Sequence, residues 1–338
     1  MDSTPLGTFV DAYATRDRTE LAIFLLDNMI WPVLVAGFVV FSLLLPGVFS
    51  SSANIQFLFF SSAALGVLTL AESICLLSGN FDLSVGSIAG FSAMFSALFL
   101  ASWVPDAPGV VGVLVALLVG AAIGAMNGIS VAYIGVNPFL QTLSFFIIWR
   151  GGVVILSTTT VFNLPESFTY LGGGTLAGAL PAAIPLVIIL FLIAGFFLRY
   201  TRMGMSIIAT GGDENSAMEA GIDTQRVTLM TFTISGMLSG LAGVLYAGFV
   251  GSVTPGLADG ALFSAFAAAI IGGMSLFGGR GKVTGAFGGV LLLSMINTGL
   301  VQLEVDPEAI QTVTGLVLLG AIILYTLESR IRTRVLSA

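Results

Sequence analysis

The chain has 338 residues, of which 57% are hydrophobic and only 9% are charged, and its formal net charge is −7. A soluble domain carries roughly 25% charged residues because its surface faces water, so this composition excludes a soluble globular protein. The chain contains no histidine and a single cysteine, Cys75. This excludes a disulfide bond within the chain and argues against metal-dependent or enzymatic chemistry.

The apolar residues form long continuous runs. Each crossing of a ~30 Å hydrocarbon layer takes about 20 apolar residues in a helix. Continuous runs favour helices over the alternating strands of a membrane β-barrel. Glycine is abundant, at 42 residues, and lies within the runs, where small residues allow helices to pack closely. The sequence therefore predicts an all-α, polytopic membrane protein.

Ten of these runs are candidate transmembrane helices. Glycine and serine residues in the third and the eighth run favour broken or re-entrant helices at those two places. In chain order, the ten predicted ranges are 29–48, 54–77, 84–102, 110–132, 138–157, 181–198, 228–250, 261–277, 284–301 and 309–327.

The distribution of charge along the chain predicts the orientation of these helices. Lys and Arg are retained preferentially in cytoplasmic loops, and the only charged residues in the predicted outer loops are acidic. Ten crossings with both termini in the cytoplasm follow from this pattern. The exception is Arg150, which we expect to be a structural cation in the outer third of the fifth helix. The basic residues of the predicted inner segments are Arg16, Arg18, Arg199, Arg202, Arg226, Arg280, Lys282, Arg330, Arg332 and Arg334.

This topology divides the chain into three parts. Residues 1–28 are expected to form a cytoplasmic N-terminal arm, with an amphipathic helix around Leu21–Leu26. Residues 29–327 form the transmembrane domain, and residues 328–338 form a cytoplasmic C-terminal tail.

The longest internal cytoplasmic segment, residues 199–227, contains a predicted short helix. A pair of glycines precedes it, Asp213 is a suitable N-cap, and Glu214 favours the positive end of the helix dipole. Gly221 occupies the position at which a glycine commonly ends a helix. An isolated helix of this length is marginally stable, so it either packs on a partner protein or serves as a solvated connector.

The segment from Gly278 to Lys282 is superficially similar to a phosphate-binding loop. That motif needs a glycine five places before its Gly-Lys pair and Ser or Thr directly after it. Leu276 and Val283 occupy those positions. We therefore expect a tight cytoplasmic turn here, and any ATP hydrolysis on another chain.

Polar side chains within the predicted helices are candidates for a solute path, because ionisable groups in a membrane are costly. Asp82 and Ser84 follow a predicted helix break, and irregular backbone at membrane depth is tolerated only inside protein or beside water. Hydrogen-bonded ties between helices would use the same residue types. The candidates are Glu72, Asn80, Asp82, Ser84, Asn127, Gln141, Thr142 and Asn297.

Three segments resemble the ribose- and xylose-type permeases of ABC importers. Residues 80–86 read Asn-Phe-Asp-Leu-Ser-Val-Gly where that family has Gly-Ile-Asp-Leu-Ser-Val-Gly. Residues 199–222 are similar to the family's cytoplasmic coupling loop. The pairs Asn127-Gly128, Pro138-Phe139, Thr142-Leu143 and Arg150-Gly151 follow the family's order and spacing, and the resemblance covers residues 31–327. Asn80-Phe81 departs from the family's Gly-Ile, which leaves the particular solute open, and residues 134–136 lack a basic residue that is common in the family.

The resemblance implies the transmembrane permease subunit of an ABC importer for a monosaccharide or a similar small polar solute, in a prokaryotic cell membrane. Such a subunit is not an enzyme and has no cofactor, because two cytoplasmic ATPase partners bind ATP and magnesium. The other implied partners are a second permease subunit, identical or paralogous, and an extracytoplasmic solute-binding protein, with no nucleic acid. The residues that would couple to the ATPase are Asp213, Glu214, Ala217, Met218, Glu219, Ala220 and Gly221.

Two alternatives remain from the sequence. An ion-gradient-driven secondary transporter would need an acidic ion site within the membrane, for which Glu72 and Asp82 are the only candidates. An ABC permease for nucleosides or branched-chain amino acids would share the same architecture.

Overall fold

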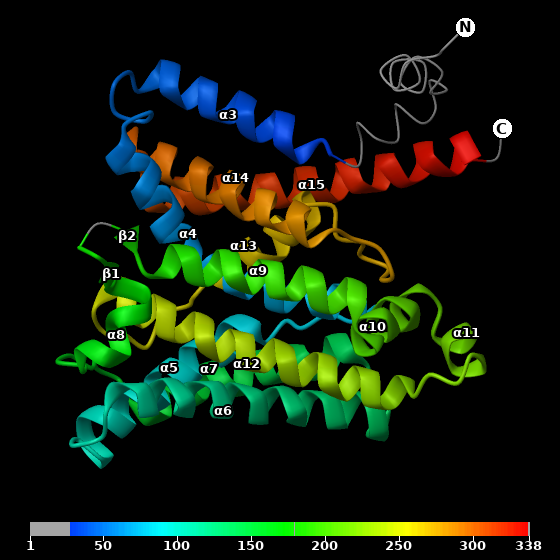
Figure 1. Ribbon diagram of the computed structural model, residues 1–338, viewed down its shortest axis with the longest axis horizontal. Helices are drawn as coiled ribbons and strands as arrows, with labels where there is room; N and C mark the ends of the chain where they lie inside the picture. Colours follow the sequence, from blue (N-terminus) through cyan, green and yellow to red (C-terminus); the bar gives the residue numbers. More distant parts are fainter. Residues whose placement is uncertain (1–27, 179, 337–338) are drawn as a thin grey trace, which may run out of the picture.

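The computed structural model describes residues 28–178 and 180–336, and within them the protein is predominantly helical (Figure 1). The predicted amphipathic helix at Leu21–Leu26 lies outside the described residues. The helices run roughly side by side along the long axis of the molecule, as expected for a membrane bundle. The prediction of an all-α protein is thus confirmed for the described part of the chain.

The first half of the bundle contains α3 (Ile30–Leu44), α4 (Ser52–Leu77), α5 (Val85–Leu98), α6 (Gly109–Ile129) and α7 (Pro138–Leu156). Single π-helical turns, Phe99–Trp103 and Ser130–Ile134, extend α5 and α6. A short helix, α8 (Glu166–Gly173), and a small antiparallel hairpin follow. The hairpin joins β1 (Thr175–Leu176) to β2 (Leu180–Pro181), with Thr175 opposite Pro181.

The second half contains α9 (Ala183–Tyr200), α10 (Arg202–Gly212), α11 (Glu214–Glu219), α12 (Thr224–Val250), α13 (Ala261–Ile271), α14 (Val283–Gln302) and α15 (Pro307–Leu336). The helix α10 was not predicted, because its segment was expected to be a loop up to the glycine pair. The predicted C-terminal tail continues α15 as helix as far as Leu336.

Seven helices of the described chain are long and apolar enough to cross a membrane: α4, α5 and α6 together with their π-helical extensions, α7, α9, α12 and α14. The other three predicted ranges also hold apolar helices, but α3, α13 and the apolar part of α15 are shorter. The eighth range was predicted as a candidate broken helix, and α13 indeed ends at Ile271, leaving the rest of that range as irregular connection.

Side-chain caps explain where several helices begin. Ser51 accepts a hydrogen bond from the backbone N–H of Asn54 at the start of α4, and Asn137 caps α7 with Pro138 in its first turn. Thr201 and Asp223 cap α10 and α12 in the same way. These residues satisfy backbone N–H groups that have no partner within the helix.

The helices α4, α12 and α14 are the most buried of the long apolar helices. In the most apolar stretch of each, 83%, 67% and 67% of the residues are buried inside the protein, against 11% for α7. The helix α12 packs against α4, α5, α6 and α8. Most of α7 therefore faces outward from this single chain, towards lipid, water or a partner.

The contact between α6 and α12 depends on glycine. A Cβ atom added to Gly120 would lie 3.1 Å from the backbone N of Gly240, and one added to Gly124 would lie 3.1 Å from the Cα of Gly236. Small residues at these positions let the two backbones touch, and dispersion contacts of this kind hold helices together in lipid.

Candidate functional site

A buried polar network forms where α4 gives way to α5. Asp82 lies in the connection between these helices and is fully buried. Its Oδ1 accepts a hydrogen bond from the backbone N–H of Ser84 at 3.0 Å, and its Oδ2 accepts one from the Oγ of Ser235 on α12 at 3.1 Å. The Ser84 hydroxyl also donates to Oδ1, at 2.5 Å. The carboxylate thus fixes the α4–α5 connection to the central helix α12.

The network continues across α6 to α7. The Nδ2 of Asn127 donates to the Oγ of Ser84 at 2.9 Å, and the Nε2 of Gln141 lies 3.5 Å from the Oδ1 of Asn127. Thr142 donates to the carbonyl of Pro138 at 2.8 Å. Four of the predicted path residues, Asp82, Ser84, Asn127 and Gln141, therefore form one connected chain of polar groups.

The remaining predicted path residues lie at different places. Glu72 on α4 is fully buried and close enough to Asp82 for an electrostatic interaction, but its oxygens accept no hydrogen bond from the described residues. Asn80 donates to the Oγ of Ser78 at 3.0 Å. Asn297 is exposed on α14, outside the network. Ser235 was not predicted, because a lone serine in an apolar run gives no signal in the sequence.

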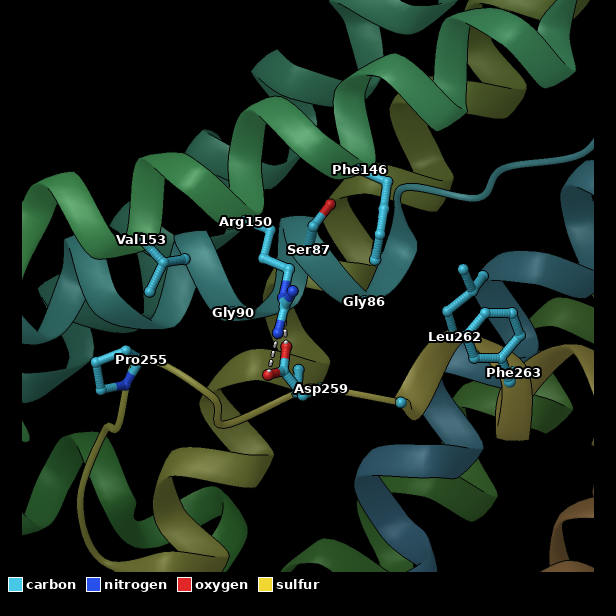
Figure 2. Close-up of a pocket in the computed structure, with 12 residues that line it drawn as sticks. Gly86, Ser87, Gly90, Phe146, Arg150, Val153, Pro255, Asp259, Leu262 and Phe263 are labelled. Carbon is cyan, nitrogen blue, oxygen red and sulfur yellow. Dashed lines mark hydrogen bonds and ion pairs between the residues drawn. The ribbon is translucent and has the colours of Figure 1, made fainter. Parts of the chain in front are cut away.

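A second polar feature joins α7 to the connection between α12 and α13 (Figure 2). The guanidinium of Arg150 donates from Nε to Oδ1 of Asp259 at 3.1 Å and from Nη2 to Oδ2 at 2.9 Å. The pair lies at a hollow of about 30 Å³ that is also lined by Gly86, Ser87 and Gly90 of α5. The expectation of a structural cation at Arg150 did not include this partner.

The predicted cytoplasmic helix is present as α11. Asp213 caps it by accepting a hydrogen bond from the backbone N–H of Ser216 at 2.6 Å, and this bond lowers the pKa of the Asp213 carboxyl. Gly221 ends the helix with a φ of 82°, a left-handed conformation that favours glycine. Ala217 is buried, whereas Met218 is exposed. Among the seven predicted coupling residues, Ala217 therefore faces the protein while Asp213, Glu214, Met218, Glu219, Ala220 and Gly221 are exposed.

Three segments that the sequence predicts to be cytoplasmic meet at glycines beside α11. A Cβ on Gly278 would lie 2.7 Å from the Cα of Gly79, and one on Gly211 would lie 2.8 Å from the N of Gly279 and collide with the carbonyl of Leu77. The backbone N–H of Gly279 donates to that carbonyl at 3.0 Å. We call these four residues, Gly79, Gly211, Gly278 and Gly279, the glycine junction. It joins the end of α4, the end of α10 and the turn before α14.

The described residues contain no group of three or more Asp, Glu, Cys or His side chains that could hold a metal ion. The polar groups of the network are mostly neutral hydroxyls and amides. They are suited to hydrogen bonding with an uncharged solute or with one another, and no arrangement of nucleophile and base accompanies them.

An all-α bundle with seven helices long and apolar enough to cross a membrane is typical of a polytopic membrane protein. Residues 54–327 match the family model described as "Branched-chain amino acid transport system / permease component". The chain therefore belongs to this family, and the prediction of an ABC permease component, rather than an enzyme, is confirmed.

Curated relatives cover most of the chain. It is 34% identical over 293 residues to the D-allose transport system permease protein AlsC of Escherichia coli strain K12, which covers 86% of this chain and 89% of the relative. It is 30% identical over 262 residues to the ribose import permease protein RbsC of the same strain, covering 76% and 80% of the two chains. The L-arabinose transport system permease protein AraH is 31% identical over 284 residues, covering 81% and 83%. No solved structure matches the chain significantly.

Proposed function

We propose that the chain is the transmembrane permease subunit of an importer that carries a monosaccharide, or a similar small neutral solute, across the cytoplasmic membrane of a prokaryote. The observation that carries the proposal is the match to permeases named for allose, ribose and arabinose over at least three quarters of the chain. The largely neutral network around Asp82 supports it, because hydroxyl and amide groups are suitable partners for sugar hydroxyls.

The proposed topology has ten crossings with both termini in the cytoplasm. Each of the ten predicted ranges contains an apolar helix, and seven helices are long enough to span the bilayer. The three shorter helices would cross only part of the layer or tilt within a locally thinner one. The predicted division into an arm (1–28), a transmembrane domain (29–327) and a tail (328–338) belongs to the same proposal.

The proposed assembly couples transport to ATP hydrolysis on two cytoplasmic subunits, which bind ATP and magnesium. The exposed surface of α11, within residues 199–227, is the proposed contact with those subunits. A second permease subunit and an extracytoplasmic solute-binding protein complete the importer. The outward-facing α7 leaves a large surface for the second subunit, since only 11% of the residues in its most apolar stretch are buried within this chain.

The buried candidates would contact solute only after the bundle changes conformation. Asp82, Asn127 and Thr142 have no exposed surface in this state. We therefore propose that the network around Asp82 holds the α4–α5 connection closed, and that helix movement driven by the ATPase exposes it in part of the transport cycle. Glu72 and Asn80 lie beside this connection, whereas the exposed Asn297 would need a partner subunit to border the path.

The test is reconstitution of the purified chain in proteoliposomes with the ATPase and binding protein that co-purify from its native membrane. Uptake of labelled D-ribose, D-allose or L-arabinose that depends on ATP is expected, with L-leucine as the control solute. Uptake of leucine alone would assign an amino-acid permease. Uptake driven by an ion gradient without ATP or a partner would replace the proposal with a secondary transporter.

A further inference from the structure

The ion pair between Arg150 and Asp259 lies beside the apolar helix α7, inside its C-terminal end. The helix α7 has 19 residues, which at ~1.5 Å per residue is about the thickness of the hydrocarbon core. Arg150 is six residues before the last residue of α7, Leu156, and therefore about 9 Å below its end. Asp259 lies at the level of Arg150 because its carboxylate accepts both hydrogen bonds from that guanidinium, and the helix that follows it, α13, has only 11 residues.

The pair is nevertheless open at the surface of the chain. The side chains of Arg150 and Asp259 are 57% and 51% exposed. Charged groups at such a depth are strongly disfavoured against lipid and face a water-filled cavity or other protein. The surface around this pair therefore borders an aqueous path or a second subunit that encloses one.

We propose that the hollow at Arg150 and Asp259 is a recognition subsite of the translocation path for a neutral, polyhydroxylated solute. This inference rests on the proposed function and adds to it the residues that recognise the solute. Under the proposed topology the hollow lies in the outer half of the membrane, where solute arrives first.

The chemistry of the pair suits vicinal hydroxyl groups. A guanidinium has five N–H donors, and Arg150 uses one on Nε and one on Nη2 to hold Asp259, so that Nη1 is directed elsewhere. The two carboxylate oxygens of Asp259 retain lone pairs beside these donors. Donor and acceptor thus lie side by side, and their opposite charges cancel, which favours a neutral solute over an ionic one.

Two aromatic residues complete the subsite. Phe146 of α7 and Phe263 of α13 line the hollow, and Phe263 is 57% exposed (Figure 2). Their faces can cover the C–H groups of a sugar ring. The enclosed volume of about 30 Å³ holds only a water molecule. A monosaccharide would therefore lie across the mouth of the hollow, against the exposed side chains.

The hollow is joined directly to the buried network. The Oγ of Ser87 donates to the carbonyl of Ser84 at 2.9 Å, one turn along α5. A Cβ on Gly86 would lie 3.3 Å from the backbone N of Leu262, so α5 and the start of α13 are in close contact beneath the ion pair. Movement of the α12–α13 connection on solute binding would consequently be transmitted to Ser84, which donates hydrogen bonds to Asp82.

The test uses cysteine accessibility in proteoliposomes. Phe263→Cys should react with a charged, membrane-impermeant thiol reagent about ten times faster than Ile148→Cys, because thiolate forms in water and not in lipid. Ile148 is a matched control: it is 53% exposed and two residues from Arg150 on the opposite face of α7. The native Cys75 is buried, so the unsubstituted chain gives the background. Phe146→Cys replaces Phe263→Cys if the latter fails to assemble.

Solute protection decides the assignment. D-ribose, D-allose or L-arabinose should slow modification of Phe263→Cys severalfold, and Arg150→Gln should abolish that protection, the rate with solute being compared with the rate without solute in the same variant. Equal rates at positions 263 and 148, no protection, or protection that survives Arg150→Gln would each overturn the subsite. Protection by L-leucine alone would overturn the solute class. Uptake by the unsubstituted importer is measured in parallel: uptake without protection refutes the subsite alone, whereas no uptake of any monosaccharide refutes the proposed function.

Discussion

Replacing Asp82 by Ala and by Asn separates the two contributions that this buried carboxylate makes. The Ala variant removes the acceptor for the N–H and hydroxyl of Ser84 and for the hydroxyl of Ser235. A hydrogen bond to a charged group contributes about 1.5–3 kcal/mol, and a buried donor left without a partner costs about 1–3 kcal/mol. Ser235 can recover part of this loss by donating to a carbonyl one turn earlier in α12.

The expected net loss for Asp82→Ala is therefore about 3 kcal/mol, which corresponds to a decrease of about 5 °C in the melting temperature. Asp82→Asn keeps an oxygen for Ser84, and its amide can donate to the Ser235 hydroxyl. It also removes a charge that has no basic partner in the described structure, so its stability should remain within about 1 kcal/mol of the unsubstituted chain.

The assay is thermal unfolding of the purified chain in mild detergent. Asp106, an exposed acidic residue in the connection between α5 and α6, provides the matched control, and both of its substitutions should leave the melting temperature unchanged. Equal destabilisation by Asp82→Ala and Asp82→Asn would refute the argument. It would show that the charge, and not the set of hydrogen bonds, holds the α4–α5 connection.

Three further predictions concern the side that the proposed topology places in the cytoplasm. Gly211→Ala should reduce ATP-driven uptake and destabilise the chain by about 1–3 kcal/mol through overpacking. The control Gly212→Ala should be nearly neutral, because a Cβ at this position meets no atom within 4 Å. Equal effects of the two substitutions would exclude the glycine junction from coupling. Met218→Asp should abolish uptake and ATPase binding without lowering the melting temperature. Ala217→Arg should instead destabilise α11, because position 217 is buried. An active Met218→Asp importer would show that the ATPase contact does not lie at α11. The folded-state pKa of Asp213 is lowered, so its cap stabilises α11 above the unfolded pKa of about 3.9 and is lost as the pH falls through the lower folded value. Hydrogen exchange of residues 214–219, corrected for the intrinsic rate, should therefore be constant from neutral pH to about pH 5. An Asp213→Ala variant should lose this protection from exchange at neutral pH.

The sequence predicted the helices well because the bilayer imposes a simple rule on them. Each crossing must be apolar over a fixed length, and the turn residues between crossings are polar, proline or glycine. The segment with α10 was harder, since Arg202–Gly212 packs as a helix against α9 although it is neither long nor strongly apolar. The start of α11 was predictable because Asp213 and Gly221 form local caps that need no tertiary information.

The site was only partly predictable for a physical reason. Asp82 and Asn127 are rare polar residues in apolar surroundings. Placing such side chains in lipid costs free energy, so the sequence alone identifies them as candidate functional residues. Their partners cannot be found in the same way. Ser235 is one of many serines, and the pairing of Arg150 with Asp259 spans 109 positions of the chain. Which charges meet depends on the inward fold of the α12–α13 connection, which apolar periodicity does not encode.

The α4–α5 connection lies at the meeting point of every feature described above. At one end, Gly79 packs into the glycine junction beside α11. In its middle, Asp82 is fixed to α12, and directly after it Gly86 and Ser87 line the hollow at Arg150. Residues 80–84 belong to no regular helix, so the side-chain bonds of Asp82 add to the few backbone bonds, such as that from the N–H of Asn80 to the carbonyl of Cys75, that hold the connection. Under the proposed assembly, a displacement of α10 and α11 by the ATPase would therefore reach the solute path through a segment of fewer than ten residues.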